Sequence, residues 1–526
     1  MKKNYINVFL YSLILFSLYC SLTIGLSWDE LAVVEISKLR LKYLFSLGAV
    51  DYKSLWFSKF YPGTYGVTAM FFSQLFPKSY ETDILHICNS LIGISTIFGI
   101  SKIAKELFNK KIGYIVFVIS FFNPIFFGHM AMNERDLVIA FCNIWMTYSL
   151  LKYFKYNYIK KKRNNIVIIL GLLLGLGLSC RISFIITLLP IFVFLTIDSL
   201  FIKKICKEKL LIKRFIKDIL ISVFIGYFIL IIFWPEVYPN IFVLPFQFFN
   251  ETLNFGWGVP QGLINGVFYE TSHPPKNYLL SFLFHKLPEY FILNYLLFFV
   301  ILIKSSSFFK KKFNNFNYKI ILVILIIIFP NLLLLISPYP IYDNIRLFLY
   351  LLPYLSIIPG IVIYYLIENL KLKLNKILTV FVSILFIYSV YTFFSLTPYQ
   401  YTYLNIFSGK FSESHKKFES DYWGTSIKEL LTKTNFENNN QINLAICGIG
   451  KGNVKYYLKK LNIRNVKIVS FDENYDYIIM TNRVFWNSNV KNLKDLNTCF
   501  DQFSGNTISS VKRRGLTLSL IRSNII

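Results

Sequence analysis

Eleven long apolar stretches dominate the chain and decide what it can fold into. They lie at about residues 5–26, 83–101, 112–128, 136–154, 165–181, 183–202, 218–234, 287–303, 319–337, 347–367 and 377–396. About 20 apolar residues in a helix cross a hydrocarbon core of about 30 Å. Since 55% of the 526 residues are hydrophobic and only 16% are charged, we predict a polytopic α-helical membrane protein with about 11 transmembrane helices.

Two stretches near the N-terminus can each be interpreted in more than one way. Residues 5–26 could be a signal peptide, but they lack an Ala-x-Ala cleavage pattern, so we interpret them as a retained helix with Lys2 and Lys3 on the inner side. Residues 61–77 include Pro62, Gly63 and Gly66. We interpret them as a re-entrant or interfacial segment instead of a span.

The net charge of +28 could indicate a nucleic-acid partner, but the basic residues cluster in short runs between apolar stretches. Alternate connections carry them, as expected for loops on the inner side of a membrane. The basic connections lie near residues 102–111, 160–163, 203–217, 304–312 and 371–376. The opposite side then holds the loops 27–82 and 235–286 and a long tail, so we predict no nucleic-acid partner.

The composition changes after residue 396, which divides the chain into a transmembrane domain, 1–396, and a tail, 397–526. In the tail, short apolar runs alternate with a helix-like segment, VKYYLKKL, which predicts a small α/β domain. Its glycine-rich segment 448–452 fits neither common nucleotide-binding pattern and is interpreted as a strand-to-helix turn. The seven cysteines show no CxxC spacing, but Cys447 and Cys499 could pair if the tail is exported.

Polar residues at the outer ends of the predicted spans are the candidate site. Ionisable groups are costly at membrane depth and therefore informative. The candidates are Asp29, Glu30, His129, Asn133, Glu134, Arg135, Asp136, Arg181, Tyr342, Asp343 and Arg346. Arginine binds phosphate oxygens and a carboxylate accepts a proton, so this set suits a site that holds a lipid phosphate and activates a hydroxyl.

Simpler explanations stay open for several of these residues. Asp29 and Glu30 could cap an interfacial helix, because acidic side chains favour the first turn. Arg135 and Arg181 could extend to lipid headgroups, and Arg346 could pair with Asp343 and only fix a loop. The aromatic-rich loop 242–282 could be an interfacial belt or cover the site, and we expect Tyr422-Trp423 to pack the tail onto the membrane domain.

Several motifs in order resemble the GT-C superfamily of membrane glycosyltransferases, up to about residue 430. The similarity is greatest to bacterial family-39-like proteins related to protein O-mannosyltransferases and aminoarabinose transferases. The motifs are Asp29-Glu30, FGHMAMNERD (127–136), WPEVYPN (234–240), 269–275, YDNIR (342–346), PYQYTYLN (398–405) and ESDYWGTS (419–426). The chain departs from the family at Glu134-Arg135, often Pro-Lys, and at Leu347, commonly His.

The resemblance implies transfer of one sugar, with inversion, from a polyprenyl-phosphate carrier to a periplasmic-side acceptor, which could be a protein, a glycolipid or a polysaccharide. Asp29 is then the expected base, Glu30 its positioning neighbour and Asp136 a second acid. The arginines at 135, 181 and 346 would hold the phosphate, and His129, Asn133, Glu134, Tyr342 and Asp343 would contact substrate.

We expect no required cofactor, although His129 and Glu134 could hold a divalent metal. The expected location is the bacterial inner membrane, with the site and the C-terminal domain on the periplasmic side. A transporter or flippase of lipid-linked sugars is the alternative, and a sensor or assembly scaffold is a third possibility. A transporter predicts inverted repeats and charged or broken segments near the bilayer midplane, and the sequence shows neither clearly.

Overall fold

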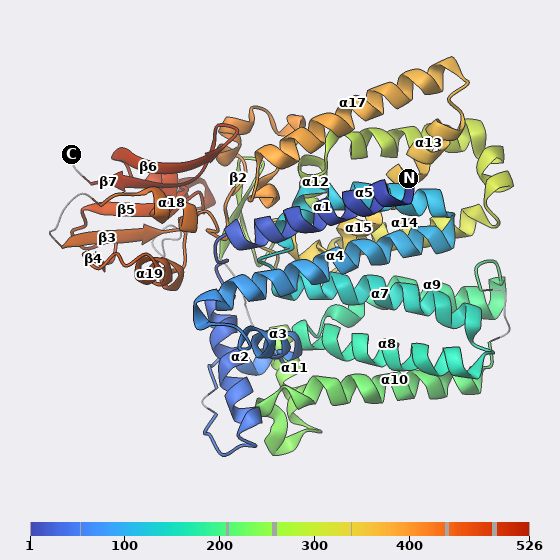
Figure 1. The fold of residues 1–526 in the computed structure, drawn as a ribbon, viewed down its shortest axis with the longest axis horizontal. Helices are drawn as coiled ribbons and strands as arrows, with labels where there is room; N and C mark the ends of the chain where they lie inside the picture. Colours follow the sequence, from blue (N-terminus) through green and yellow to red (C-terminus); the bar gives the residue numbers. More distant parts are fainter. Residues whose placement is uncertain are drawn as a thin grey trace.

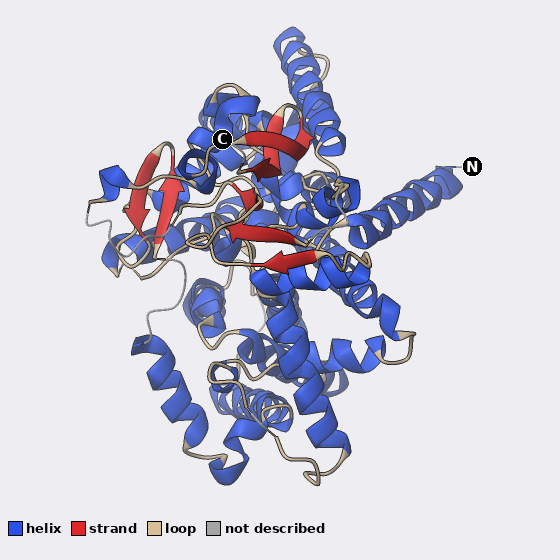
Figure 2. Ribbon diagram, turned by 90° about the vertical axis from the view of Figure 1, so that its left-hand side faces the viewer, coloured by secondary structure: helices blue, strands red, loops and turns tan. Residues whose placement is uncertain are grey.

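The computed structural model describes residues 2–52, 54–206, 210–254, 260–337, 339–436, 441–485 and 492–524. Long helices lie side by side in one helical domain, and a small sheet domain packs against one end of it (Figure 1). We call that end the sheet-domain end. Figure 2 looks onto it, with the strands lying in front of the helix ends.

The helical domain contains long helices and several short ones. They are α1 (Lys2–Thr23), α2 (Glu30–Phe45), α3 (Thr64–Ser73), α4 (Glu81–Leu107), α5 (Lys110–Phe121), α6 (Pro124–His129), α7 (Glu134–Tyr156), α8 (Lys160–Cys180), α9 (Phe184–Ile197), α10 (Ile212–Ile232), α11 (Leu244–Asn254), α12 (Tyr278–Lys286), α13 (Glu289–Lys312), α14 (Phe316–Ile336), α15 (Leu351–Leu355), α16 (Ile357–Glu368) and α17 (Lys373–Ser395). In the described ranges, nine helical stretches are long and apolar enough to cross a membrane. The protein is thus an integral membrane protein.

The predicted span 5–26 corresponds to α1, which is a single helix of 22 residues. Another predicted span is interrupted. The predicted span 112–128 is divided into α5 and α6, because the Asn123 side chain accepts a hydrogen bond from the Phe126 N–H and Pro124 occupies the first position of α6. A capping asparagine followed by proline begins a new helix.

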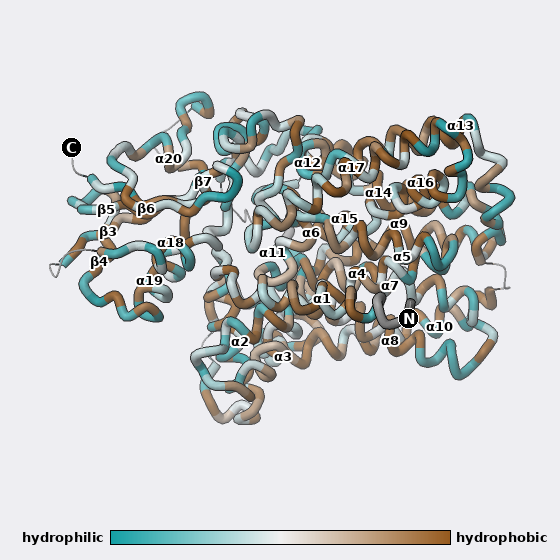
Figure 3. The backbone as a smooth tube through the Cα atoms, turned by 45° about the horizontal axis from the view of Figure 1, so that its top comes forward, coloured by the Kyte–Doolittle hydropathy of each residue, from teal (hydrophilic) through white to brown (hydrophobic). Residues whose placement is uncertain are grey.

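The remaining topology follows the predicted pattern. The basic connections that follow α7, α9, α13 and α16 lie at the end far from the sheet domain (Figures 1 and 3). Residues 61–77 contain only the ten-residue helix α3, too short to cross a bilayer. The non-spanning interpretation of that segment is therefore confirmed.

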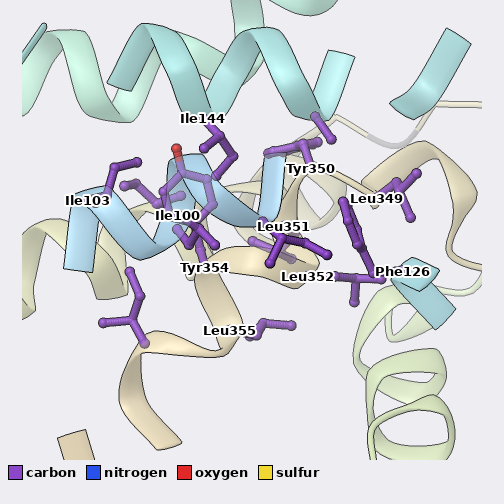
Figure 4. Packing of buried hydrophobic residues seen from close by; sticks show 14 of the residues in the cluster. Ile100, Ile103, Phe126, Ile144, Leu349, Tyr350, Leu351, Leu352, Tyr354 and Leu355 are labelled. Atoms are coloured by element: carbon purple, nitrogen blue, oxygen red, sulfur yellow. The ribbon is translucent and has the colours of Figure 1, made fainter. Parts of the chain in front are cut away.

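The main core lies where α4, α7 and α15 meet (Figure 4). Ile100, Ile144 and Leu351 are fully buried there. The Tyr354 hydroxyl donates to Asn143 Oδ1 at 2.8 Å and lies 2.6 Å from Thr147 Oγ1. Helices in lipid associate through close packing and such hydrogen bonds, because lipid tails are as apolar as the side chains.

The loop 242–282 is partly structured, although its residues 255–259 lie outside the described ones. Strands β1 (Gln261–Ile264) and β2 (Val267–Glu270) form an antiparallel hairpin. Asn265 and Gly266 make its turn with φ of 49° and 82°, as a two-residue hairpin turn requires. The Ile341 N–H donates to the Thr271 carbonyl oxygen at 3.0 Å, so the hairpin supports the loop that carries Asp343.

The sheet domain has five strands, β3 (Ile442–Cys447), β4 (Val466–Ile468), β5 (Tyr477–Thr481), β6 (Asn506–Arg513) and β7 (Leu516–Ser523), and three helices, α18 (Ile427–Lys433), α19 (Lys451–Lys460) and α20 (Cys499–Gln502). The strand order is β4-β3-β5-β7-β6. The first three strands are parallel and β7 is antiparallel to both of its neighbours. The small C-terminal α/β domain is therefore confirmed, and a disulfide joins Cys447 to Cys499 as the sequence allowed.

Residues 397–418 connect the two domains and lie against the helices. Glu289 at the start of α13 accepts hydrogen bonds from the Tyr403 hydroxyl at 3.1 Å and from the Ile406 N–H at 2.9 Å. The Asn405 side chain donates to the Leu287 carbonyl oxygen at 2.9 Å. These contacts fix the sheet domain over the helix ends.

Candidate functional site

A cavity at the sheet-domain end brings most of the candidate residues together. We call it the site cavity; it is lined by Ser27, Asp29, Glu30, Val33, Asn89, Met132, Asn133, Glu134, Arg135, Asp136, Arg181, Arg346 and Trp423. Eight of the eleven predicted site residues are in this set, and the other three, His129, Tyr342 and Asp343, lie outside the lining. These eight residues follow the C-terminal ends of α1, α6, α8 and α14, which lie close together at the cavity.

Asp29 is the most accessible acid of the cavity. Its side chain is 52% exposed, and its nearest cation is Arg346, with Nη1 3.8 Å from Oδ2. Asp29 stands at the N-cap of α2, but its side chain makes no capping hydrogen bond. The carboxylate is thus free to accept a proton from a bound hydroxyl.

Glu30 is buried and held from two sides. Its Oε1 lies 2.7 Å from Nε2 of His86 on α4, and its Oε2 accepts a hydrogen bond from the Ser27 N–H at 2.9 Å. His86 Nδ1 lies 3.0 Å from the Ser21 carbonyl oxygen, which can only accept, so Nδ1 carries a proton. Glu30 therefore anchors the turn that presents Asp29.

The start of α7 supplies a second group of polar side chains. Asn133 caps the helix by accepting from the Asp136 N–H at 3.2 Å, and its amide donates to Asp136 Oδ2 at 3.2 Å. Asp136 Oδ1 lies 3.1 Å from Arg181 Nη2. Asp136 is thus engaged on both oxygens and orients Arg181.

Three arginines face the cavity in different ways. Arg135 lies with Cζ 3.8 Å from the centroid of the Tyr61 ring. Arg181 is 23% exposed beside Asp136, and its Nε, like that of Arg346, is buried without a hydrogen-bond partner among the described residues. Buried hydrogen-bond donors normally have an acceptor, and a phosphate oxygen is a suitable acceptor for a guanidinium group.

Asp343 lies behind Arg346 and is shared between two cations. It accepts hydrogen bonds from Trp423 Nε1 at 3.0 Å and Arg483 Nη2 at 2.8 Å, and it lies 3.1 Å from Arg346 Nη2. Burial alone would raise the pKa of Asp343, but the two guanidinium groups hold that pKa below its usual value. The predicted pairing of Arg346 with Asp343 is therefore present, and Arg346 still lines the cavity.

His129 is fully buried behind the same wall. Its Nε2 lies 2.9 Å from the Tyr422 hydroxyl, and its Nδ1 lies 3.3 Å from Asn133 Nδ2. Burial, together with the positive charges of Arg346 and Lys286, lowers the pKa of His129 to about 3. The imidazole is neutral at physiological pH, and it braces Asn133 and Tyr422 without lining the cavity.

A second cavity lies on the other side of the Glu134-Arg135 pair. We call it the loop cavity; its lining is Val33, Ile36, Ser37, Arg40, Tyr61, Gly63, Tyr65, Gly66, Glu134, Arg135, Ser179 and Cys180. It shares Val33, Glu134 and Arg135 with the site cavity. The two cavities together give Arg135 access to two separate spaces.

The described residues contain no group of three or more His, Cys, Asp or Glu side chains placed to hold a metal ion. His129 and Glu134, the predicted candidates, do not form part of such a set.

Some residues at the site were not predicted. His86 lies within an apolar stretch, where a lone ionisable group is a signal in itself. Lys286 is buried at the end of α12 and donates to the Tyr401 carbonyl oxygen at 3.3 Å. Arg483 follows strand β5 with no local motif around it. Tyr422 and Trp423 were expected to pack the tail onto the membrane domain, and they do so.

Comparisons with known proteins agree with this architecture. Residues 65–237 match the family profile of dolichyl-phosphate-mannose-protein mannosyltransferases. No curated protein sequence matches the chain.

Among solved structures, ArnT from Cupriavidus metallidurans in the apo state is similar over 100% of this chain and 99% of its own, with a TM-score of 0.53 and 11% identity. The apo oligosaccharyltransferase of Archaeoglobus fulgidus matches 90% of this chain and 69% of its own, with a TM-score of 0.48 and 10% identity. The resemblance to the GT-C membrane glycosyltransferases is thus confirmed, in the fold that this chain shares with ArnT and in the family profile that its residues 65–237 match.

Proposed function

We propose that the protein is a polyprenyl-phosphate-sugar-dependent glycosyltransferase that moves one sugar, with inversion, to an acceptor on the periplasmic side of the bacterial inner membrane. The observation that carries the proposal is the site cavity, where an accessible carboxylate, Asp29, faces Arg135, Arg181 and Arg346. Such a pairing of one base with fixed positive charge suits a displacement from a phosphate leaving group. The fold shared with ArnT supports the assignment.

In the proposed reaction, Asp29 accepts the proton of the acceptor hydroxyl as its oxygen attacks the anomeric carbon. The bond between that carbon and the phosphate oxygen breaks, and the electron pair stays on the phosphate. A single displacement inverts the anomeric centre and needs no covalent sugar-enzyme intermediate. Arg135 and Arg181 hold the phosphate as its negative charge increases.

The other predicted residues take supporting roles. Glu30 positions the Asp29 turn through Ser27 and His86. Asp136 pairs with Arg181, so we assign it the role of orienting that arginine. In this proposal the donor and the acceptor occupy the two cavities that meet at Arg135.

The orientation is part of the proposal. Disulfides persist in oxidising compartments, and the Cys447–Cys499 bond lies in the sheet domain. The basic connections lie at the opposite end of the helices (Figure 1), as expected for the inner side. Both observations support a periplasmic site.

The test is sugar transfer from labelled polyprenyl-phosphate sugars to native acceptors in membranes. Asp29→Asn should lower kcat by about 10²- to 10⁴-fold, the usual contribution of a general base. Asp51→Asn is the matched control, because Asp51 is an exposed acid in the same loop. Wild-type and Asp29→Asn proteins with equal turnover would contradict the role of Asp29, and no turnover with any donor of a broad panel would contradict the transferase.

A further inference from the structure

The sheet domain holds the segment that directly precedes Asp29. The shortest hydrogen bonds between residues 22–27 and the sheet domain are Lys428 Nζ to the Leu22 oxygen at 2.7 Å, Gly25 N–H to the Thr425 oxygen at 3.1 Å, Leu26 N–H to the Tyr457 hydroxyl at 2.7 Å and Asn453 Nδ2 to the Ser27 oxygen at 2.8 Å. The turn that carries the proposed base is therefore fixed by α18, α19 and the residues before them.

Arg483 extends this contact into the site. Its side chain is buried and donates to Asp343 Oδ1 at 2.8 Å and to the Tyr422 carbonyl oxygen. Its Nε lies 3.6 Å from Glu419 Oε1, and its Cζ lies 5.2 Å from the centroid of the Trp28 ring. The guanidinium thus contacts two neighbours of the site residues, Asp343 on one side and Trp28 on the other.

The contacts form a continuous series from the sheet domain to the base. Asp343 is shared between Arg483 and Arg346, and Arg346 Nη1 lies 3.8 Å from Asp29. With Arg483 removed, Arg346 is the one cation of the described part of the chain that still pairs with the buried Asp343 carboxylate. Arg346 then shifts towards Asp343 and away from the cavity, because a buried charge that is incompletely paired is costly.

We infer that Arg483 is a positioning residue for the sugar transfer: it sets Arg346 through Asp343 and Asp29 through Trp28, and so makes the sheet domain part of the active unit. The inference rests on the proposed function. It assigns the sheet domain a role in catalysis.

Arg483→Gln should lower kcat by at least tenfold and change the donor KM by less than threefold, since no described atom of Arg483 lines the site cavity. Arg483→Lys keeps the charge next to Asp343 and should recover part of kcat. Arg522→Gln is the matched control, because Arg522 lies on β7 of the same domain and donates to the Phe500 and Phe503 carbonyl oxygens. If Arg522→Gln lowered kcat as much as Arg483→Gln, the loss would be explained by destabilisation of the sheet domain. That result would overturn the inference.

A double-mutant cycle separates this inference from the proposed function. In an Asp343→Asn background, Arg483→Gln should change the melting temperature by less than half of its effect in the wild-type background, because the partner is already neutral. If the two substitutions changed the melting temperature additively, the coupling between Arg483 and Asp343 would be refuted, whether or not the protein transfers sugar. Wild-type transfer with an unchanged kcat in Arg483→Gln would overturn the positioning role alone and leave the transferase standing.

Discussion

Lys286 gives the clearest test of how burial governs charge beside the site. Its side chain is 1% exposed, and its ammonium donates to the Tyr401 carbonyl oxygen at 3.3 Å. Burial lowers the pKa of Lys286 from 10.5 to about 7. Moving a charged ammonium out of water costs free energy, and a hydrogen bond to a single carbonyl oxygen offsets only part of that cost.

The sign and size of the effect on stability follow from linkage. Between pH 7 and pH 10.5 the unfolded chain keeps the lysine proton that the folded protein has lost, so the free energy of unfolding rises with pH across this window. Each pH interval of 1 is worth about 1.4 kcal/mol, so the whole rise is about 5 kcal/mol as an upper bound. Lys286→Met keeps the length of the side chain and removes the titrating group.

The assay is the melting temperature of the purified protein between pH 6 and pH 10. The wild-type melting temperature should increase with pH, whereas that of Lys286→Met should start several degrees higher and change less. Lys276→Met, an exposed lysine of the same loop, should behave as wild type. The reasoning fails if Lys286→Met and wild type show the same dependence on pH.

Two further changes test the sheet domain. Replacing Cys447 and Cys499 by serine opens a cross-link that spans 52 residues and should lower the free energy of unfolding of the domain by about 4 kcal/mol; an unchanged midpoint in chemical denaturation would contradict this. Gly25→Ala would place a Cβ 2.2 Å from the Thr425 carbonyl oxygen, whereas Gly452→Ala meets its nearest atom at 3.6 Å. Gly25→Ala should therefore lower both the melting temperature and kcat, and equal effects of the two alanines would argue against a tight contact.

Most membrane helices could be predicted because the length of an apolar stretch is a local property of the sequence. The exception is the span 112–128, where Asn123 and Pro124 separate two short helices. Both residue types are known helix-start signals, but the uninterrupted apolar character around them outweighed that signal in the prediction. Local capping chemistry determined the break.

The candidate site could be predicted in part, because polar residues at helix ends on one side of a membrane must lie near each other. This placed Asp29, Arg135, Arg181 and Arg346 around one cavity. The partners of these residues could not be predicted in the same way. Arg483 meets Asp343 across 140 residues of sequence, and only the packing of two domains brings them together.

The hydrogen bond between the Leu26 N–H and the Tyr457 hydroxyl joins positions 431 residues apart. At about 5 to 20 residues per second of synthesis, the first loop waits about 20 to 90 s for its partner to be made. During this interval the growing chain contains Asp29 but not the helix that holds the turn before it. A ribosome-bound fragment that stops before residue 457 thus lacks the hydrogen bond that fixes the turn before Asp29.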